Sequence, residues 1–212
     1  MLNGNDPVEL GFAQSLAHPG GNITGLVRSS PELIGKNLEL LAEAVPGVKR
    51  IGVLFNPSNR AHEQSEANLA KAAGLLGLQY QIFYAREAKE IEPAIKSART
   101  KRMQALLVMG DGMYFQRREQ IAALALAHRL PSSYANTEHV EAGGLLSYSP
   151  SSLSNYRRGA SFVDKILRGA KPGDIPIEQP AKLDLAVNVK TARALGLAIP
   201  QSILLRADQV VE

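Results

Sequence analysis

The sequence predicts an α/β fold with a parallel, doubly wound sheet. Short apolar runs recur through the middle of the chain, and each is followed by a segment with apolar residues at helical spacing. Strands and helices that alternate at this length favour parallel strands joined by right-handed crossovers, with helices on both faces of the sheet. The segments on either side fit this pattern less simply.

The central elements follow from apolar runs and helical periodicity. The run KRIGVLFN ends in Asn-Pro and is typical of a buried strand. The helix after it carries Leu69, Ala73 and Leu76 on one face, and Gly77 is suited to end it. The same reasoning predicts strands at residues 49–56, 79–85, 104–110 and 131–135, and helices at residues 59–76, 87–101 and 116–128. We expect the first three strands to lie in the middle of the sheet.

The N-terminal flank is predicted to begin with a helix. Asp6 can cap it, Pro7 suits the first helical position, and Glu9 completes a capping box. This helix is expected to end near residues 18–21, where the sequence reads His-Pro-Gly-Gly. It is followed by a predicted strand at residues 22–27 and a helix at residues 31–45.

The C-terminal flank contains one long amphipathic helix, predicted at residues 155–167. Tyr156, Ala160, Val163 and Leu167 share one face of it, which we expect to point inward. The other expected elements are a strand at residues 144–148, a Pro-rich connection at 171–180, a strand at 182–188 and a helix from residue 191.

Composition excludes several classes of function. The 212 residues include no cysteine, which excludes disulfides, thiolate zinc sites and cysteine nucleophiles. The formal net charge is +4, and the basic residues form scattered pairs, which is typical of solvated helix faces rather than of a nucleic-acid stripe. No apolar run approaches the ~20 residues of a membrane span. The first residues lack the pattern of a signal peptide, which predicts a cytoplasmic location if the chain is expressed as given.

Sequence motifs for catalysis and for metal or phosphate binding are missing. The sequence has no GxSxG elbow, no P-loop lysine and no HExxH helix, and the four histidines lack metal-ligand spacing. We interpret His18, His62, His128 and His139 as surface or capping residues. We therefore expect no catalytic residues, no cofactor and no metal, and favour a binding protein over an enzyme.

Polar and aromatic residues follow three of the predicted strands. In parallel α/β sheets, ligands bind beyond the carboxyl ends of strands, where helix N-termini also present N–H groups. Asp111 could hold an ammonium group, amides and hydroxyls could orient polar atoms, and aromatic rings could wall an apolar moiety. The candidate residues are Asn56, Ser58, Asn59, Asp111, Tyr114, Phe115, Tyr134 and Asn136.

Each of these residues also has a purely structural interpretation. Ser58, Asn59 and Thr137 are suited to be N-caps, and Asp111 is suited to a turn. The structural interpretation is the stronger one for any single residue, whereas the three loops together favour a ligand-binding face.

Several segments resemble one known family. NGNDPVELGFAQSLAHPGGNITGL, KRIGVLFNPSN, YRRGASFVDKILRG and KLDLAVNVKTARALGL are similar to ABC transporter substrate-binding proteins of the tryptophan/tyrosine-binding type. The resemblance covers essentially the whole chain and lies in the order of segments rather than in a short motif. It implies a periplasmic-binding-protein-like fold of type I, a small solute such as an amino acid bound between two lobes, an ABC permease as partner, and a periplasmic or extracytoplasmic location.

The resemblance also implies a division into lobes. Residues 1–28 would be a remnant of the first lobe, 29–146 the second α/β lobe, 147–180 a return to the first lobe, and 181–212 the closing strand and helix of the second. The turn at Asp6 would face the cleft from the first lobe, so Asp6 joins the candidate ligand-binding residues.

The family's first lobe begins with several strand–helix units that have no counterpart in this sequence. The resemblance therefore implies that most of the first lobe, and half of the cleft, is missing, so that this chain binds solutes weakly. The remaining first-lobe helices would lack sheet partners, which predicts a homodimer through their apolar residues. Two alternatives stay open: a ligand-sensing regulatory domain of the same fold, and a flavodoxin-like enzyme that uses nucleotides.

Overall fold

The computed structural model describes residues 7–8, 10–27, 31–180 and 182–212. The chain divides into two compact units. Unit 1 comprises Met1–Ser30 and Pro150–Leu183, and unit 2 comprises Pro31–Ser149 and Asp184–Glu212. The assignment of these units to two lobes stays a proposal.

Strands and helices alternate along the described chain from Pro31 onward. In order they are α1 (Pro31–Ala44), β1 (Arg50–Phe55), α2 (Arg60–Leu75), β2 (Gln79–Tyr84), the 3-10 helix η1 (Ala88–Glu90), α3 (Ile91–Thr100), β3 (Ala105–Val108), α4 (Gly112–Gln116), α5 (Arg118–Ala127), β4 (Ser132–Tyr134), α6 (Thr137–Glu141), β5 (Leu146–Pro150), α7 (Ser152–Leu167), the 3-10 helix η2 (Pro172–Asp174), β6 (Leu183–Asn188), α8 (Val189–Leu195), α9 (Gln201–Leu204) and β7 (Gln209–Val211).

The strands form one seven-stranded sheet in the order β2-β1-β3-β4-β5-β6-β7. β1 pairs in parallel with β2 and β3, β3 with β4, β4 with β5, and β6 with β7. This mostly parallel sheet confirms the predicted α/β class. The expectation that β2 is a middle strand is wrong, because β2 lies at an edge. Its sequence QYQIFY alternates polar and apolar residues, and most of its side chains are at least partly exposed, whereas every residue of β3 is buried.

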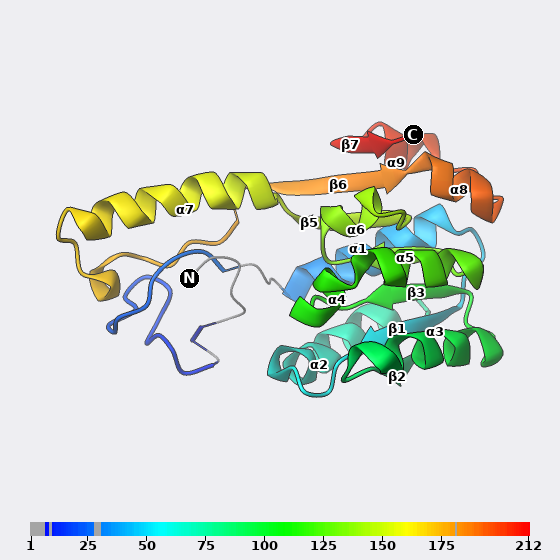
Figure 1. Ribbon diagram of the computed structural model, residues 1–212, viewed down its shortest axis with the longest axis horizontal. Coiled ribbons are helices and arrows are strands. Elements are labelled where there is room, and N and C mark those ends of the chain that lie inside the picture. Colours follow the sequence, from blue (N-terminus) through cyan, green and yellow to red (C-terminus); the bar gives the residue numbers. More distant parts are fainter. Residues whose placement is uncertain (1–6, 9, 28–30, 181) are drawn as a thin grey trace. The chain divides into compact units, whose positions relative to one another are not determined.

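Apolar residues are buried on both faces of this sheet. Side chains alternate along a strand, so β1 contributes to both layers. Ile51 and Val53 belong to one core cluster with Leu38 of α1 and Leu69 of α2. Leu54 belongs to a second cluster on the other side, together with Ile91 and Ile95 of α3 and Ile121 of α5. The helices therefore cover both faces of the sheet, as expected for a doubly wound fold (Figure 1).

The elements predicted for the centre of the chain are confirmed. Five short elements were not predicted from the sequence: α4, α6, η2, α9 and β7. The helix expected at residues 116–128 is preceded by α4, and the two meet at Arg117, whose φ of −102° and ψ of 19° interrupt the helix.

The helix predicted after Asp6 is wrong for the described residues, while Asp6 and Glu9 themselves lie outside them. Residues 7–8 and 10–11 form turns, and residue 12 forms a bend. The N–H of Gly11 bonds to the carbonyl of Val8 at 3.0 Å, and that of Phe12 to the carbonyl of Pro7 at 2.7 Å. These two bonds are the Schellman pair that closes a helix, and Gly11 takes the left-handed φ of 74° that the motif requires. The described chain thus turns away from a helical path at Gly11.

The strand predicted at residues 22–27 is also reduced. Bridge pairing in this segment is confined to Val27 and Leu26, and Leu26 forms a parallel bridge with Glu178. Its neighbour Val27 belongs to a small core cluster with Ala13 and Ile177.

The long helix α7 is present, but the predicted inward face is wrong. Asn155, Gly159 and Phe162 are its buried residues, and Phe162 packs with Leu26 and Ile175 of unit 1. Tyr156 is 61% exposed and Leu167 is 82% exposed. The face of α7 that contains Asn155, Gly159 and Phe162 therefore packs against the rest of unit 1. The more apolar face, which contains Tyr156 and Leu167, is exposed to solvent.

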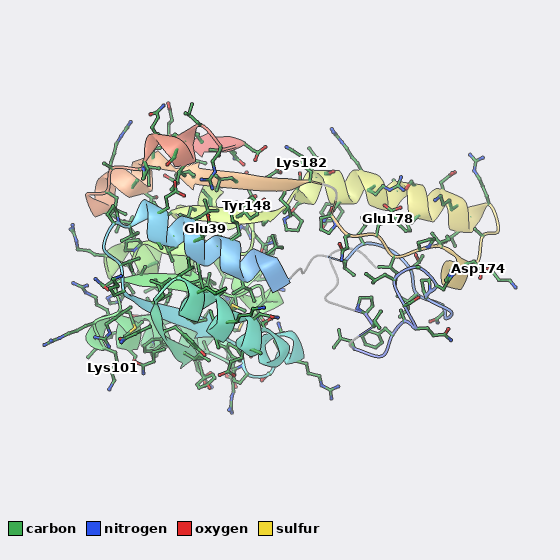
Figure 2. The ribbon with its side chains drawn as sticks, turned by 180° about the vertical axis from the view of Figure 1, so that it is seen from behind. Glu39, Lys101, Tyr148, Asp174, Glu178 and Lys182 are labelled. Atoms are coloured by element: carbon green, nitrogen blue, oxygen red, sulfur yellow. The ribbon has the colours of Figure 1, made fainter. Side chains whose placement is uncertain are left out.

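A bidentate ion pair fastens α7 to the segment that follows it. The guanidinium of Arg158 donates from Nε to one carboxylate oxygen of Glu178 at 2.7 Å and from Nη2 to the other at 2.6 Å. Figure 2 labels Glu178 on the segment beside α7. The hydrogen bond from Arg158 lowers the pKa of the Glu178 carboxyl below its usual range.

Among the described residues, we find no helix that is both long and apolar enough to cross a membrane.

Candidate functional site

Three loops follow the carboxyl ends of parallel strands in the sheet of unit 2, and we call this end of the sheet the carboxyl edge. Leu54 of β1 aligns with Val108 of β3, and Val108 aligns with Tyr134 of β4. These strands are parallel neighbours, so the loops after their carboxyl ends begin side by side. We call residues 56–59 the β1 loop, 109–111 the β3 loop and 135–136 the β4 loop. Their shared edge agrees with the expectation from the sequence.

Asp111 joins the β1 loop to the β3 loop. Its Oδ2 accepts hydrogen bonds from Nδ2 of Asn56 at 3.1 Å and from Nδ2 of Asn59 at 2.9 Å. Its Oδ1 accepts bonds from the backbone N–H groups of Met113 at 2.8 Å and Tyr114 at 3.3 Å, and so caps α4. One carboxylate therefore orders two loops and one helix.

These bonds bear on the role predicted for Asp111. A carboxylate offers about four acceptor positions, and here four donors within the chain occupy them. The charge of Asp111 is thus balanced inside unit 2 by amide and backbone dipoles. Binding of a ligand ammonium by Asp111 stays a prediction, and the observed geometry favours an organising role.

The β1 loop is a tight turn held by Asn56. The Oδ1 of Asn56 accepts a bond from the N–H of Ser58 at 3.0 Å, which is an Asx turn. Asn56 is 8% exposed, whereas Ser58 is exposed at the surface of the loop. The Asn56 amide is thus used within the fold, whereas contact of Ser58 with a solute stays a prediction.

The two tyrosines of the predicted set are core residues. The hydroxyl of Tyr114 donates to the carbonyl of Ala85 at 2.8 Å, and the hydroxyl of Tyr134 accepts a bond from Oγ of Ser132 at 2.8 Å. Both side chains are 0% exposed, and burial raises the pKa of each phenol far above its usual value. They stay neutral, and their burial argues against direct contact with a solute.

A row of rings connects the β3 and β4 loops. His139 of α6 stacks on Tyr134 with ring centroids 4.8 Å apart, and Phe115 of α4 meets His139 edge-on at 6.3 Å. The guanidinium of Arg118 lies 5.4 Å from the centroid of the Phe115 ring. Phe115 is only partly buried, so it is the aromatic residue of the predicted set that is open to solvent. Asn136, 5% exposed, is the N-cap residue of α6.

Two histidines also contact residues at the carboxyl edge of the sheet, and the sequence interpretation missed them. His62 is 2% exposed and His139 is 3% exposed, so their assignment as surface residues is wrong. His62 lies six residues after Asn56, on the first turn of α2. The available signal was the position of His62, on the first helical turn after the loop that follows a predicted strand. An isolated histidine without metal-ligand spacing does not by itself indicate a function.

Gly144 sets the position of Tyr134. A Cβ built at Gly144 would overlap the ring of Tyr134 and would lie 2.8 Å from the carbonyl oxygen of His139. The chain before β5 therefore passes against both residues with only a hydrogen atom between them.

Across the described residues, no group of three or more His, Asp or Glu side chains could hold a metal ion. The donors of the edge are mainly amides and backbone N–H groups, and its carboxylate is already satisfied. The β1, β3 and β4 loops together with Phe115 form a polar surface with one solvent-exposed aromatic ring, and we call this surface the rim. Such a surface suits non-covalent recognition of a small solute.

Comparison with known proteins gives the family. A family model described as "ABC transporter substrate binding protein" matches residues 1–211. The chain belongs to this family.

Three relatives extend this result. A tyrosine-binding protein of Clostridioides difficile (strain R20291) is 28% identical over 199 residues, which is 91% of this chain and 55% of that protein. The structure of a conserved domain protein from Vibrio cholerae O1 biovar El Tor N16961 has a TM-score of 0.91 at 27% identity and covers 99% of this chain and 70% of that one. An ABC domain from Streptococcus pneumonia in complex with L-Trp has a TM-score of 0.89 at 26% identity, with 98% and 69% covered.

These relatives confirm the resemblance read from the sequence. The fold is that of a type I periplasmic-binding-protein-like substrate-binding protein, and two of the three relatives bind an aromatic amino acid. The chain spans about half the length of the curated relative that it matches.

Proposed function

We propose that this chain is the larger part of a solute-binding protein of an ABC importer, and that its solute is an amino acid with an apolar or aromatic side chain. The observation that carries this proposal is the rim organised by Asp111, beyond the carboxyl ends of β1 and β3, in a chain of the substrate-binding family. The relatives that bind tyrosine and tryptophan support the solute class.

Within the rim, the proposed contacts divide by exposure. Ser58 and Phe115 are open to solvent, so a hydroxyl for polar atoms and a ring for an apolar side chain are available on one rim. Asn59 and Asn136 are proposed to orient polar atoms of the solute. Asp6, which lies outside the described residues, is proposed as a contact from the other lobe.

The proposed mechanism needs two lobes. A solute that bridges them stabilises the closed form by its higher affinity for that form. A small ligand is normally buried over about 70–90% of its surface, and each ~1.4 kcal/mol of lost contact weakens binding tenfold. We therefore expect this chain alone to bind amino acids far more weakly than its longer relatives do.

Binding can be measured through the solute itself. The chain contains no tryptophan, so the fluorescence of added L-Trp reports only on the solute. We expect the emission of L-Trp to shift on titration with the chain, and L-Tyr and L-Leu to compete for the same site. An unchanged emission at millimolar protein would overturn the proposal for this chain.

A matched pair of variants locates the site. Asp111→Asn replaces two acceptor positions with donors that face the amides of Asn56 and Asn59, so we expect L-Trp binding to weaken at least tenfold. Glu119→Gln makes the same change at a carboxylate on α5 that is 82% exposed and should leave binding unchanged. Equal binding by all three proteins would place the solute elsewhere.

The partner and location follow from the family as proposals. An ABC permease in the membrane is proposed to receive the solute, and the chain is proposed to act outside the cytoplasm and not as an enzyme. Uptake of labelled amino acid in cells that carry or lack the permease genes would test the partnership.

We also propose that the exposed face of α7 is covered by a second copy of this chain. Leu153, Tyr156, Ala160, Val163 and Leu167 recur at alternating steps of three and four, which is the spacing of a helix-pairing seam. Leu153 is 62% exposed and Val163 is 56% exposed, so the seam faces solvent in a single copy.

The charges beside this seam favour an antiparallel pair. A two-fold axis near Ala160 would place Arg157 of one copy beside Asp164 of the partner subunit, and the same contact would repeat on the other side. The small Ala160 at the centre would allow the two helices to approach closely. Such a contact is self-complementary, as a symmetric dimer requires.

Size-exclusion chromatography with light scattering tests this dimer. We expect the wild-type chain to dimerise as its concentration rises, and Val163→Glu to stay monomeric because it places a charge in the seam. Leu75→Glu is the control, since Leu75 is an 81% exposed apolar residue on α2. A wild-type monomer at high concentration would exclude the proposed pair.

A further inference from the structure

The β1 and β3 loops are joined a second time by the ring of His62. The N–H of Asn56 donates to Nδ1 of His62 at 2.9 Å, and Nε2 of His62 lies 3.0 Å from the carbonyl oxygen of Gly110. An N–H donor requires a bare Nδ1, and a carbonyl oxygen requires a protonated Nε2. Both contacts are satisfied by one state of the ring, the neutral tautomer with its proton on Nε2.

The surroundings of the ring allow it little freedom. Phe55 of β1 packs against it with ring centroids 4.9 Å apart, and the ring of Tyr114 on α4 lies 6.3 Å away. The residue is 2% exposed. The described titratable groups that face it are the Asp111 carboxylate and the neutral Tyr114 phenol.

We propose that His62 is a positioning residue of the solute-binding rim, and that its neutral Nε2–H form ties the β1 loop to the β3 loop. The ring acts through the backbone of Asn56 and Gly110 and does not touch the solute. Protonation of Nδ1 would set two donors against each other at Asn56, so acid would break the tie and loosen the rim. The effect on solute binding rests on the proposed function, whereas the tie itself does not.

The electrostatic environment supports the neutral form. Burial lowers the pKa of His62 below its usual value, and this effect outweighs the charge of Asp111 and the two backbone hydrogen bonds, which raise it. Because the folded pKa is depressed, the unfolded chain takes up the proton more readily. The stabilisation is fully present above about pH 6.5 and is lost as the pH falls below it, by up to tenfold in the folding equilibrium constant for each pH unit.

The first arm of the test needs no solute. The ¹⁵N shifts of the His62 ring should show a bare Nδ1 and a protonated Nε2 at pH 7.5. Urea unfolding between pH 5 and 8 should show the acid loss of stability in the wild-type chain and in His128→Ala, a control at a partly buried histidine of unit 2. The loss should be smaller in His62→Asn, which keeps an acceptor near Asn56, and in His62→Gln, which keeps a donor near Gly110, because neither side chain titrates.

The second arm measures L-Trp binding at pH 7.5 and at pH 5.5. We expect wild-type affinity to fall several-fold at the lower pH, and the affinities of His62→Asn and His62→Gln to be weaker at pH 7.5 but independent of pH. A proton on Nδ1, or an equal acid loss in His62→Asn, would overturn the tie. If His62 makes stability depend on pH as expected but both variants bind L-Trp with wild-type affinity, the positioning role would be overturned. If no protein binds L-Trp, the proposed function fails, while the first arm still decides the tie.

Discussion

Unit 2 and unit 1 bury their apolar residues in different ways. In unit 2, the sheet carries a core on each face, with Leu69 on one side and Ile95 on the other, and the helices cover both. In unit 1, two small clusters centred on Val27 and Leu26 hold the chain, and the apolar side of α7 is open to solvent. The comparison shows that a sheet covered by helices on both faces buries its apolar side chains within one unit. A single amphipathic helix buries its apolar face only where a neighbouring segment packs against that face.

The largest effect should come from the core of unit 2. Leu106→Ala removes a side chain of β3 that is 0% exposed, among Leu54 and Ile95, and should lower the free energy of unfolding by about 2–5 kcal/mol. Urea unfolding followed by circular dichroism measures it. Leu75→Ala, at an exposed position of α2, should change it by less than about 0.5 kcal/mol. Similar losses in the two variants would contradict the picture of a closed core.

A smaller effect is expected from the corresponding change in unit 1. Phe162→Ala removes the largest side chain from the cluster with Leu26 and Ile175, and its cost should be near the transfer value of the side chain, about 1.5–3 kcal/mol, because so small a cluster can collapse around the cavity. Hydrogen exchange should accelerate in α7 and stay unchanged in β1 and β3. Acceleration in both units would show that they unfold together, which would remove the distinction drawn above.

The smallest effect should come from the ion pair on α7. The pKa of Glu178 is lowered by its bond to Arg158, so the pair contributes above about pH 4.5 and its contribution is lost as the pH falls. Both side chains are substantially exposed, so salt should weaken the pair. An NMR titration of the Glu178 carboxyl in wild-type and Arg158→Gln chains measures it, with Glu66 as a reference carboxyl on α2. Titration of Glu178 at the same pH in both chains would refute the pairing.

The same contrast decides how far the sequence could predict the structure. The longer strands and helices of unit 2 were predicted because their signals are local: apolar runs such as KRIGVLFN, and helical spacing such as that of Ile91, Ala94, Ile95 and Ala98, all of which are buried. The third of the predicted strands is buried throughout, as expected. The polar residues that alternate with apolar ones in QYQIFY are the signal that β2 is an edge strand.

Unit 1 was predicted poorly because its burial is decided by distant partners. The outer stripe of α7 is more apolar than the inner one, so hydrophobicity alone selects the wrong face. Asn155 and Gly159 are buried because small residues let the helix approach its neighbours, which periodicity does not reveal. In the candidate site, the three loops could be predicted from strand ends, but the saturation of Asp111 and the burial of Tyr134 depend on contacts between segments far apart in the sequence.

The contact of Gly144 with Tyr134 has a consequence for the rim. A single methyl group at position 144 would displace the ring of Tyr134, which stacks on His139, which in turn meets Phe115. The orientation of an aromatic ring at the solvent-facing rim is thereby linked to a backbone position outside the three loops. If the rim binds the proposed solute, a substitution at this remote glycine would alter the orientation of Phe115 without replacing any residue proposed to contact that solute.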